Sequence, residues 1–167
     1  MFDKFGEFNS YEELNLAAEG FKKEGDKESL MELAEENGID MEDAKDYMDG
    51  TIPEFATTFS AALGRLEVMK AEKIEKNKNK MERMALGEIY RMAKSMCTEE
   101  AFAKSVMKKG KRIERIYVFM RSGAEKHKEG NEGISAGTDQ ELRNIIRAYF
   151  QESDKKCKTV IEALYDK

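Results

Sequence analysis

The 167-residue chain has little of the side-chain chemistry on which enzymes depend. It contains one histidine, two cysteines, one proline and no tryptophan. A serine or cysteine nucleophile normally needs a histidine held beside it, but His127 lies between two lysines, as a solvated side chain does. Cys97 and Cys157 stand far apart with no metal-ligand spacing, which is typical of free thiols in a reducing cytosol. The sequence therefore predicts a protein that is not an enzyme and that has no cofactor and no metal site.

Long hydrophobic runs are also missing. No stretch approaches the roughly 18 apolar residues of a membrane span, and the opening MFDKFGEF lacks the basic-then-apolar order of a signal peptide. The scarcity of proline and of β-branched runs, with abundant Ala, Leu, Met, Glu and Lys, favours helices. We therefore expect a cytoplasmic protein of the all-α class, with a small acidic N-terminal three-helix unit followed by a helical bundle.

Charge is abundant, and it is unevenly distributed along the chain. Residues 1–54 carry five basic and seventeen acidic side chains, a net charge of −12, whereas residues 55–128 carry eighteen basic and nine acidic ones, a net charge of +9. The remaining residues, 129–167, carry six basic and eight acidic side chains. Regions of opposite sign steer association with charged partners. The sequence therefore predicts a protein that acts by binding, with an acidic end and a basic middle.

Capping residues and glycines divide the chain into three predicted parts. Residues 1–50 form the acidic three-helix unit, whose first helix opens with the capping-box pair Ser10 and Glu13. Residues 51–97 form long helices, the first beginning near Pro53, with a polar section at 70–80 that is either a solvated helix or a hinge. Residues 98–167 form a third part, in which Thr98 and Thr138 each cap a helix. Glycines at 130, 133 and 137 predict a connecting loop.

Apolar side chains recur at spacings of three and four, which predicts a buried stripe on each helix. These stripes include Met41, Phe59 and Met81. Many of the stripe residues are methionines, which serve either as ordinary core or as an adaptable binding surface. Both a monomer and a homodimer are therefore compatible with the pattern.

The acidic residues of the first part have two interpretations. They either keep the surface soluble, or they imitate phosphates and occupy the basic channel of a nucleic-acid-binding protein. The second interpretation is that of a DNA mimic. The candidate partner-binding acids are Glu12, Glu13, Glu35, Glu36, Asp43 and Asp46.

The helix predicted at 111–128 carries the candidate basic side. Its apolar residues recur on one face, whereas the basic residues gather on the opposite side or its flank. The basic side chains suit phosphates and an aromatic ring suits a base, although a solvated helix face explains the same pattern. The candidates are Lys111, Arg112, Arg115, Phe119 and Lys126.

Residues 99–152 resemble the core of the PcfK-like family, which occurs on conjugative and integrative mobile elements of Gram-positive gut bacteria. The resemblance is carried by Phe102-Ala103-Lys104, the lysines from 108 to 111, the small-residue loop at 130–137, the acidic cap at 139–141 and the pair Tyr149-Phe150. The family includes inhibitors (anti-CRISPR proteins) of the type II CRISPR nuclease, an RNA-guided enzyme that cuts DNA.

The resemblance implies a function for the predicted binding protein. We expect it to inhibit a type II CRISPR effector nuclease by direct contact with the nuclease or its guide complex. The alternative is a nucleic-acid-binding accessory protein of conjugative transfer. The two hypotheses differ in which charged side binds: the acidic unit in the first and the basic helix in the second.

Overall fold

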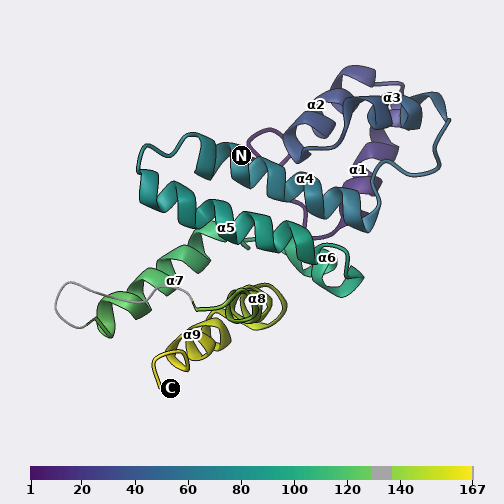
Figure 1. Cartoon of the computed structure of the whole chain (residues 1–167). Coiled ribbons are helices and arrows are strands. Elements are labelled where there is room, and N and C mark those ends of the chain that lie inside the picture. Colours follow the sequence, from purple (N-terminus) through teal and green to yellow (C-terminus); the bar gives the residue numbers. More distant parts are fainter. Residues whose placement is uncertain (129–136, 167) are drawn as a thin grey trace.

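The computed structural model describes residues 1–128 and 137–166, and within them every regular element is a helix (Figure 1). The predicted all-α class is confirmed. The predicted loop at 130–137 falls almost wholly outside the described residues. The helices are α1 (Tyr11–Glu24), α2 (Lys27–Asn37), α3 (Met41–Asp49), α4 (Thr58–Lys70), α5 (Lys80–Met96), α6 (Glu100–Val106), α7 (Ile113–Lys126), α8 (Asp139–Arg147) and α9 (Asp154–Glu162), with π-helical turns η1 (Ala71–Glu75) and η2 (Ala148–Glu152).

The first three helices form the predicted three-helix unit, which packs around a first core that Ala61 of α4 and Met107 also enter. Side chains of Ser10, Asp26 and Asp40 accept hydrogen bonds from backbone N–H groups in the first turns of α1, α2 and α3. Gly25 ends α1 in the left-handed conformation, and α2 and α3 end in the same way. The core of the unit contains Leu14, Ala18, Leu30, Leu33, Ala34, Ala44, Tyr47 and Phe55.

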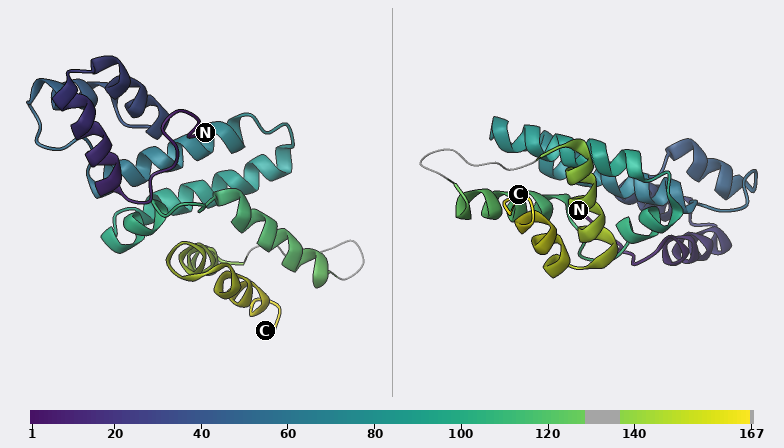
Figure 2. Two further views of the ribbon diagram at one scale, coloured as in Figure 1. Left: turned by 180° about the vertical axis from the view of Figure 1, so that it is seen from behind. Right: turned by 60° about the horizontal axis from the view of Figure 1, so that its bottom comes forward.

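The remaining helices enclose a second, larger core. Helices α4 and α5 lie side by side, and α6 to α9 pack beneath them in the view of Figure 1. Helix α4 contributes to both cores, because Ala61 lies in the first and Ala62 and Leu66 lie in the second. The predicted boundaries after residues 50 and 97 stay predictions. Figure 2 shows the three-helix unit at one end of the molecule and α7 and α9 toward the other.

Helix α4 begins at Thr58, so the predicted helix start near Pro53 is wrong. The Asn15 side chain holds this segment against α1: its Oδ1 accepts hydrogen bonds from the N–H groups of Phe55 (2.9 Å) and Ala56 (3.0 Å). Its Nδ2 donates to the Ala56 carbonyl oxygen at 2.7 Å. With these backbone groups already paired, the helix starts only after Thr57, whose hydroxyl caps Ser60 N–H.

Two other predicted boundaries are settled by local polar groups. Helix α6 is preceded by Glu99 at its N-cap and not by the predicted Thr98, whose hydroxyl instead donates to the Ser95 carbonyl. The polar section at 70–80 is not one continuous helix: η1 extends α4 as far as Glu75, the chain then turns, and Asn79 caps α5 by accepting from Met81 and Glu82 N–H. The predicted cap of α8 at Thr138 is confirmed, with Glu141 completing the capping box.

Met41, Phe59 and Met81, which the spacing predicted to be buried, are exposed. Met41 and Phe59 are each 40% exposed and Met81 is 73% exposed. All three lie in the first turns of their helices. Met69, Met92, Met96 and Met120 are buried in the second core, whereas Met107 is buried in the first core and Met48 packs partly buried against it.

Candidate partner-binding surfaces

The six predicted acidic residues lie on three different helices. They occupy the first turn of α1 (Glu12, Glu13), the later part of α2 (Glu35, Glu36) and α3 (Asp43, Asp46). Within residues 1–128 and 137–166, no three acidic, His or Cys side chains converge closely enough to hold a metal ion. The acids therefore form a distributed charged surface over the unit.

Two of these acids already have structural tasks. Glu36 is half-buried, and its carboxylate accepts hydrogen bonds from the backbone N–H groups of Lys4 (2.7 Å) and Phe5 (2.9 Å). Glu13 accepts from Asn9 N–H at 2.7 Å and so closes the start of α1. The other four predicted acids are exposed. A hydrogen bond from the Ser10 side chain lowers the pKa of Glu12, which keeps its carboxylate ionised.

The acidic and basic regions differ in how their charges are paired. Counted over the described part of the chain, four of the seventeen acids in residues 1–54 form ion pairs. Eleven of the eighteen cations in residues 55–128 do so. The excess charge of the acidic unit is therefore largely available to a partner, whereas most of the basic charge is neutralised inside the molecule.

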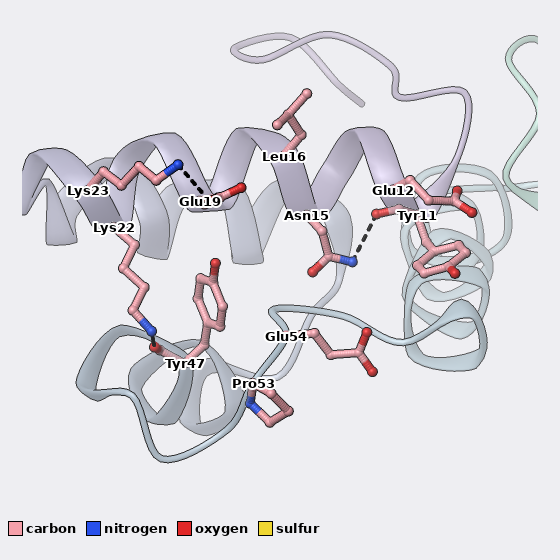
Figure 3. Close-up of a pocket in the computed structure, with 10 residues that line it drawn as sticks. All are labelled: Tyr11, Glu12, Asn15, Leu16, Glu19, Lys22, Lys23, Tyr47, Pro53 and Glu54. Carbon is pink, nitrogen blue, oxygen red and sulfur yellow. Dashed lines mark hydrogen bonds and ion pairs between the residues drawn. The ribbon is translucent and has the colours of Figure 1, made fainter.

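An open groove runs beside α1 on the acidic unit (Figure 3). One side is formed by α1 and the other by Tyr47 and the segment that carries Pro53 and Glu54. Lys22 closes one end, donating to the Tyr47 carbonyl oxygen at 2.5 Å, with its ammonium 4.3 Å from the centroid of the Tyr47 ring. The predicted acid Glu12 lies at the other end, so this groove adjoins the acidic surface.

A buried charge network joins the two cores. Arg65 on α4 is 1% exposed, and its guanidinium donates to Glu7 (3.2 Å) and to the carbonyl oxygens of Phe8 (2.6 Å) and Met107 (2.5 Å). Arg112, one of the predicted basic residues, donates to both oxygens of the same Glu7 carboxylate, at 2.7 and 2.8 Å. Arg112 therefore ties the N-terminal segment to the bundle.

The protonation states of this network follow from burial and charge. Burial alone would raise the pKa of Glu7, but hydrogen bonds and charge from Arg112, together with the charge of Arg65, lower it overall. Burial lowers the pKa of Arg65 to about 10, against the opposing effect of Glu7, so it stays charged at neutral pH. The Nε atom of Arg65 has no hydrogen-bond partner among the described residues.

Sequence reasoning missed both Glu7 and Arg65. One signal was present: position 65 falls on the face of α4 that also carries Ala61, Ala62 and Met69, so a charged residue interrupts a buried stripe. A buried guanidinium requires a carboxylate. Glu7 lies 58 residues away, and no local pattern marks it.

The predicted basic residues separate into three places. Lys111, Arg115 and Phe119 lie together where α7 meets α9 and η2. Arg112 points to Glu7, as described above. Lys126 lies at the end of α7, where it donates to Glu162 at 3.0 Å beside His127, which contacts the same carboxylate at 2.6 Å. The structure therefore keeps three of the five as one group.

The two cysteines are buried. Burial raises the pKa of the Cys97 and Cys157 thiols to about 12 each. Both are therefore protonated thiols packed in the second core. The ring of His127 stacks on the ring of Tyr165, with the two ring centroids 4.4 Å apart.

The chain was compared with protein families, curated proteins and solved structures. No protein-family model, curated protein or solved structure matches the chain. The resemblance to PcfK-like proteins stays a prediction. In the described residues, no helix has the length and apolar character needed to cross a membrane.

Proposed function

We propose that this chain is a non-catalytic binding protein whose acidic unit docks on a positively charged surface of a nucleic-acid-binding protein. The observation that supports this proposal is the large share of unpaired carboxylates on residues 1–54. Charges that lack an internal partner keep their long-range field, which speeds the encounter with an oppositely charged surface. A surface of paired charges has a much weaker field.

The resemblance of residues 99–152 to PcfK-like proteins suggests which partner this is. A type II CRISPR effector holds its RNA–DNA heteroduplex in a positively charged channel and reads a short flanking motif through arginines. Exposed carboxylates such as those of Glu12, Asp43 and Asp46 would take the places of phosphates on that surface. The protein would then inhibit the nuclease in the cytoplasm by occupying its DNA-binding surface.

The test is a DNA-cleavage assay with purified guide-loaded effector and increasing amounts of this protein. We expect the wild type to slow cleavage. The triple variant Glu12→Gln, Asp43→Asn, Asp46→Asn should need roughly tenfold more protein for half-inhibition, because each lost charge weakens binding by a few tenths to one kcal/mol.

A matched control removes three exposed carboxylates from the bundle instead. The variant Glu88→Gln, Glu125→Gln, Glu152→Gln makes the same change in net charge, and it should inhibit like the wild type. Cutting that proceeds unchanged at excess wild-type protein would remove the nuclease as the target. Equal inhibition by the two triple variants would show that the acidic unit is not the docking surface.

A further inference from the structure

A half-buried phenylalanine is surrounded by cations where α7 meets α9. The ammonium of Lys158, on α9, lies 4.7 Å from the centroid of the Phe119 ring, and the guanidinium carbon of Arg115 lies 5.7 Å from it. The ring of Tyr149 packs against Phe119 edge-to-face, with the centroids 6.3 Å apart. Phe119 is therefore held in place from one side while its neighbours on the surface are positively charged.

The cations of this group outnumber the acids. Arg115 and Lys158 contact the Phe119 ring, and two further positive charges lie nearby: Lys108, and Lys111, whose ammonium donates to the Tyr149 carbonyl oxygen at 2.5 Å. Within the described residues, Asp154 is the carboxylate paired with one of the four, Arg115. Burial lowers the pKa of Lys111, and the nearby cations Lys108 and Arg115 lower it further, against the opposing effect of Asp154. Like charges therefore crowd together at this place on the surface.

This arrangement differs from other basic positions on α6 and α7. Lys104, Arg121 and Lys126 each have an acidic partner within 3.0 Å. Around Phe119 the positive charge remains in excess, which favours a ligand that carries several negative charges. Two of those charges lie over the Phe119 ring, so their side chains must turn toward phosphates before a base can stack on it. An aromatic ring among cations is the combination found in sites that stack a base next to a phosphate backbone.

We propose that Lys108, Lys111, Arg115 and Lys158 bind the phosphates of single-stranded nucleic acid while Phe119 stacks on a base. A duplex hides the faces of its bases inside the stack, so the ring contributes only to the binding of an unpaired strand. An acidic protein would be attracted by the same cations but would gain nothing specific from the ring. The site lies toward the opposite end of the molecule from the acidic unit (Figure 2), and it does not depend on the proposed docking of that unit.

The test measures binding of the full-length protein to a fluorescently labelled single-stranded DNA of about 20 nucleotides, long enough to cover one site. An RNA of the same sequence forms a second arm, and stronger binding in one arm identifies the preferred strand. We expect saturable binding that weakens steeply with salt and is tighter than binding to the matching duplex.

Two variants test the proposed site and a third serves as their control. Lys158 is exposed, and Lys158→Glu should weaken binding at least about tenfold. Phe119→Leu removes the ring and should weaken single-strand binding roughly tenfold while leaving duplex binding unchanged. Lys45→Glu makes the same charge change as Lys158→Glu on the acidic unit, at an exposed site of α3, and should have little effect.

Thermal unfolding of each variant separates loss of the site from loss of the fold, because Phe119 also packs on Tyr149. Absence of saturable binding to either strand would overturn the proposal. So would equal weakening by Lys158→Glu and Lys45→Glu, which would indicate a general charge effect. If folded Phe119→Leu binds the single strand as tightly as the wild type does, Phe119 does not stack on a base. The same conclusion follows if the wild type binds the duplex as tightly as the single strand.

Discussion

The acidic unit and the bundle use charge in opposite ways. In residues 55–128 most cations are tied to acids on neighbouring turns or helices, so their charge contributes mainly inside the molecule. In residues 1–54 most acids have no such partner in the described chain, and the unit is held together by its apolar core and by helix caps. The difference indicates that charge on the unit is available for a partner, whereas charge on the bundle mainly supports the fold.

Glu7 differs from the other paired acids of residues 1–54 because its partners, Arg65 and Arg112, belong to the bundle. Glu7→Ala leaves Arg65 buried without a carboxylate. We expect this to lower the free energy of unfolding by about 3 kcal/mol, as measured by urea denaturation. Glu32→Ala, which removes the partner of Lys4 on the surface, should cost less than about 1 kcal/mol. A similar small effect of both changes would contradict the role given to Glu7.

The same network predicts a pH dependence. The pKa of Glu7 is lower in the folded protein than its ordinary value of 4.5, so its ionised form stabilises the fold above that value. This stabilisation is lost as the pH falls through the lowered pKa. The difference in unfolding free energy between wild type and Glu7→Gln should therefore be constant near neutral pH and shrink below about pH 4.5. A difference that stays constant down to about pH 3 would contradict the network.

The joint between the two regions is also sterically tight. A Cβ atom on Gly64 of α4 would lie 2.7 Å from the Gly38 carbonyl oxygen and would also collide with Asn37 O. Because both obstacles are backbone atoms, we expect Gly64→Ala to cost about 2–3 kcal/mol in urea denaturation. The matched control is Gly87→Ala in α5, where a Cβ would meet nothing within 4 Å. That change should stabilise the protein by about 0.5–1 kcal/mol through helix propensity. Destabilisation by both would show that the joint is not special.

The smallest expected effects test the surface charges themselves. Asp49 ends α3 without an ion pair in the described residues, next to the negative end of the helix dipole. Asp49→Asn should be neutral or stabilise by up to about 0.5 kcal/mol, because it also relieves repulsion within the unit. Glu88→Gln removes an ion pair with Arg91 on the bundle and should destabilise by about 0.3–0.5 kcal/mol. Chemical denaturation at low salt measures the unfolding free energy of both variants. Destabilisation by Asp49→Asn together with stabilisation by Glu88→Gln would contradict the difference between the two regions.

Local chemistry predicted the helices well. The caps at Ser10 and Thr138 bond to backbone N–H groups three residues away, so the sequence displays them directly. Burial periodicity likewise predicted most of the two cores. The misplaced start of α4 shows the limit, because the Asn15 side chain that holds residues 55 and 56 comes from another helix.

The candidate surfaces were less predictable for the same reason. Spacing on one helix placed Arg112 and Lys126 with Lys111, but Glu7 and Glu162, distant in the sequence, draw these two side chains elsewhere. Lys158 joins Phe119 from a helix that begins 35 residues further along the chain, and no periodicity on α7 indicates it. Net charge along the sequence predicted an acidic region, whereas its lack of internal pairing required the folded structure.

The most direct measurement is equilibrium binding of purified, guide-loaded type II CRISPR effector to the wild type, the acidic-unit triple variant and the bundle triple variant at low and moderate salt. We expect the wild type and the bundle variant to bind equally and to lose affinity as salt increases. The acidic-unit variant should bind roughly tenfold more weakly and with a shallower salt dependence. Identical affinities and salt dependences for the two triple variants, or no binding by the wild type, would contradict the proposed docking.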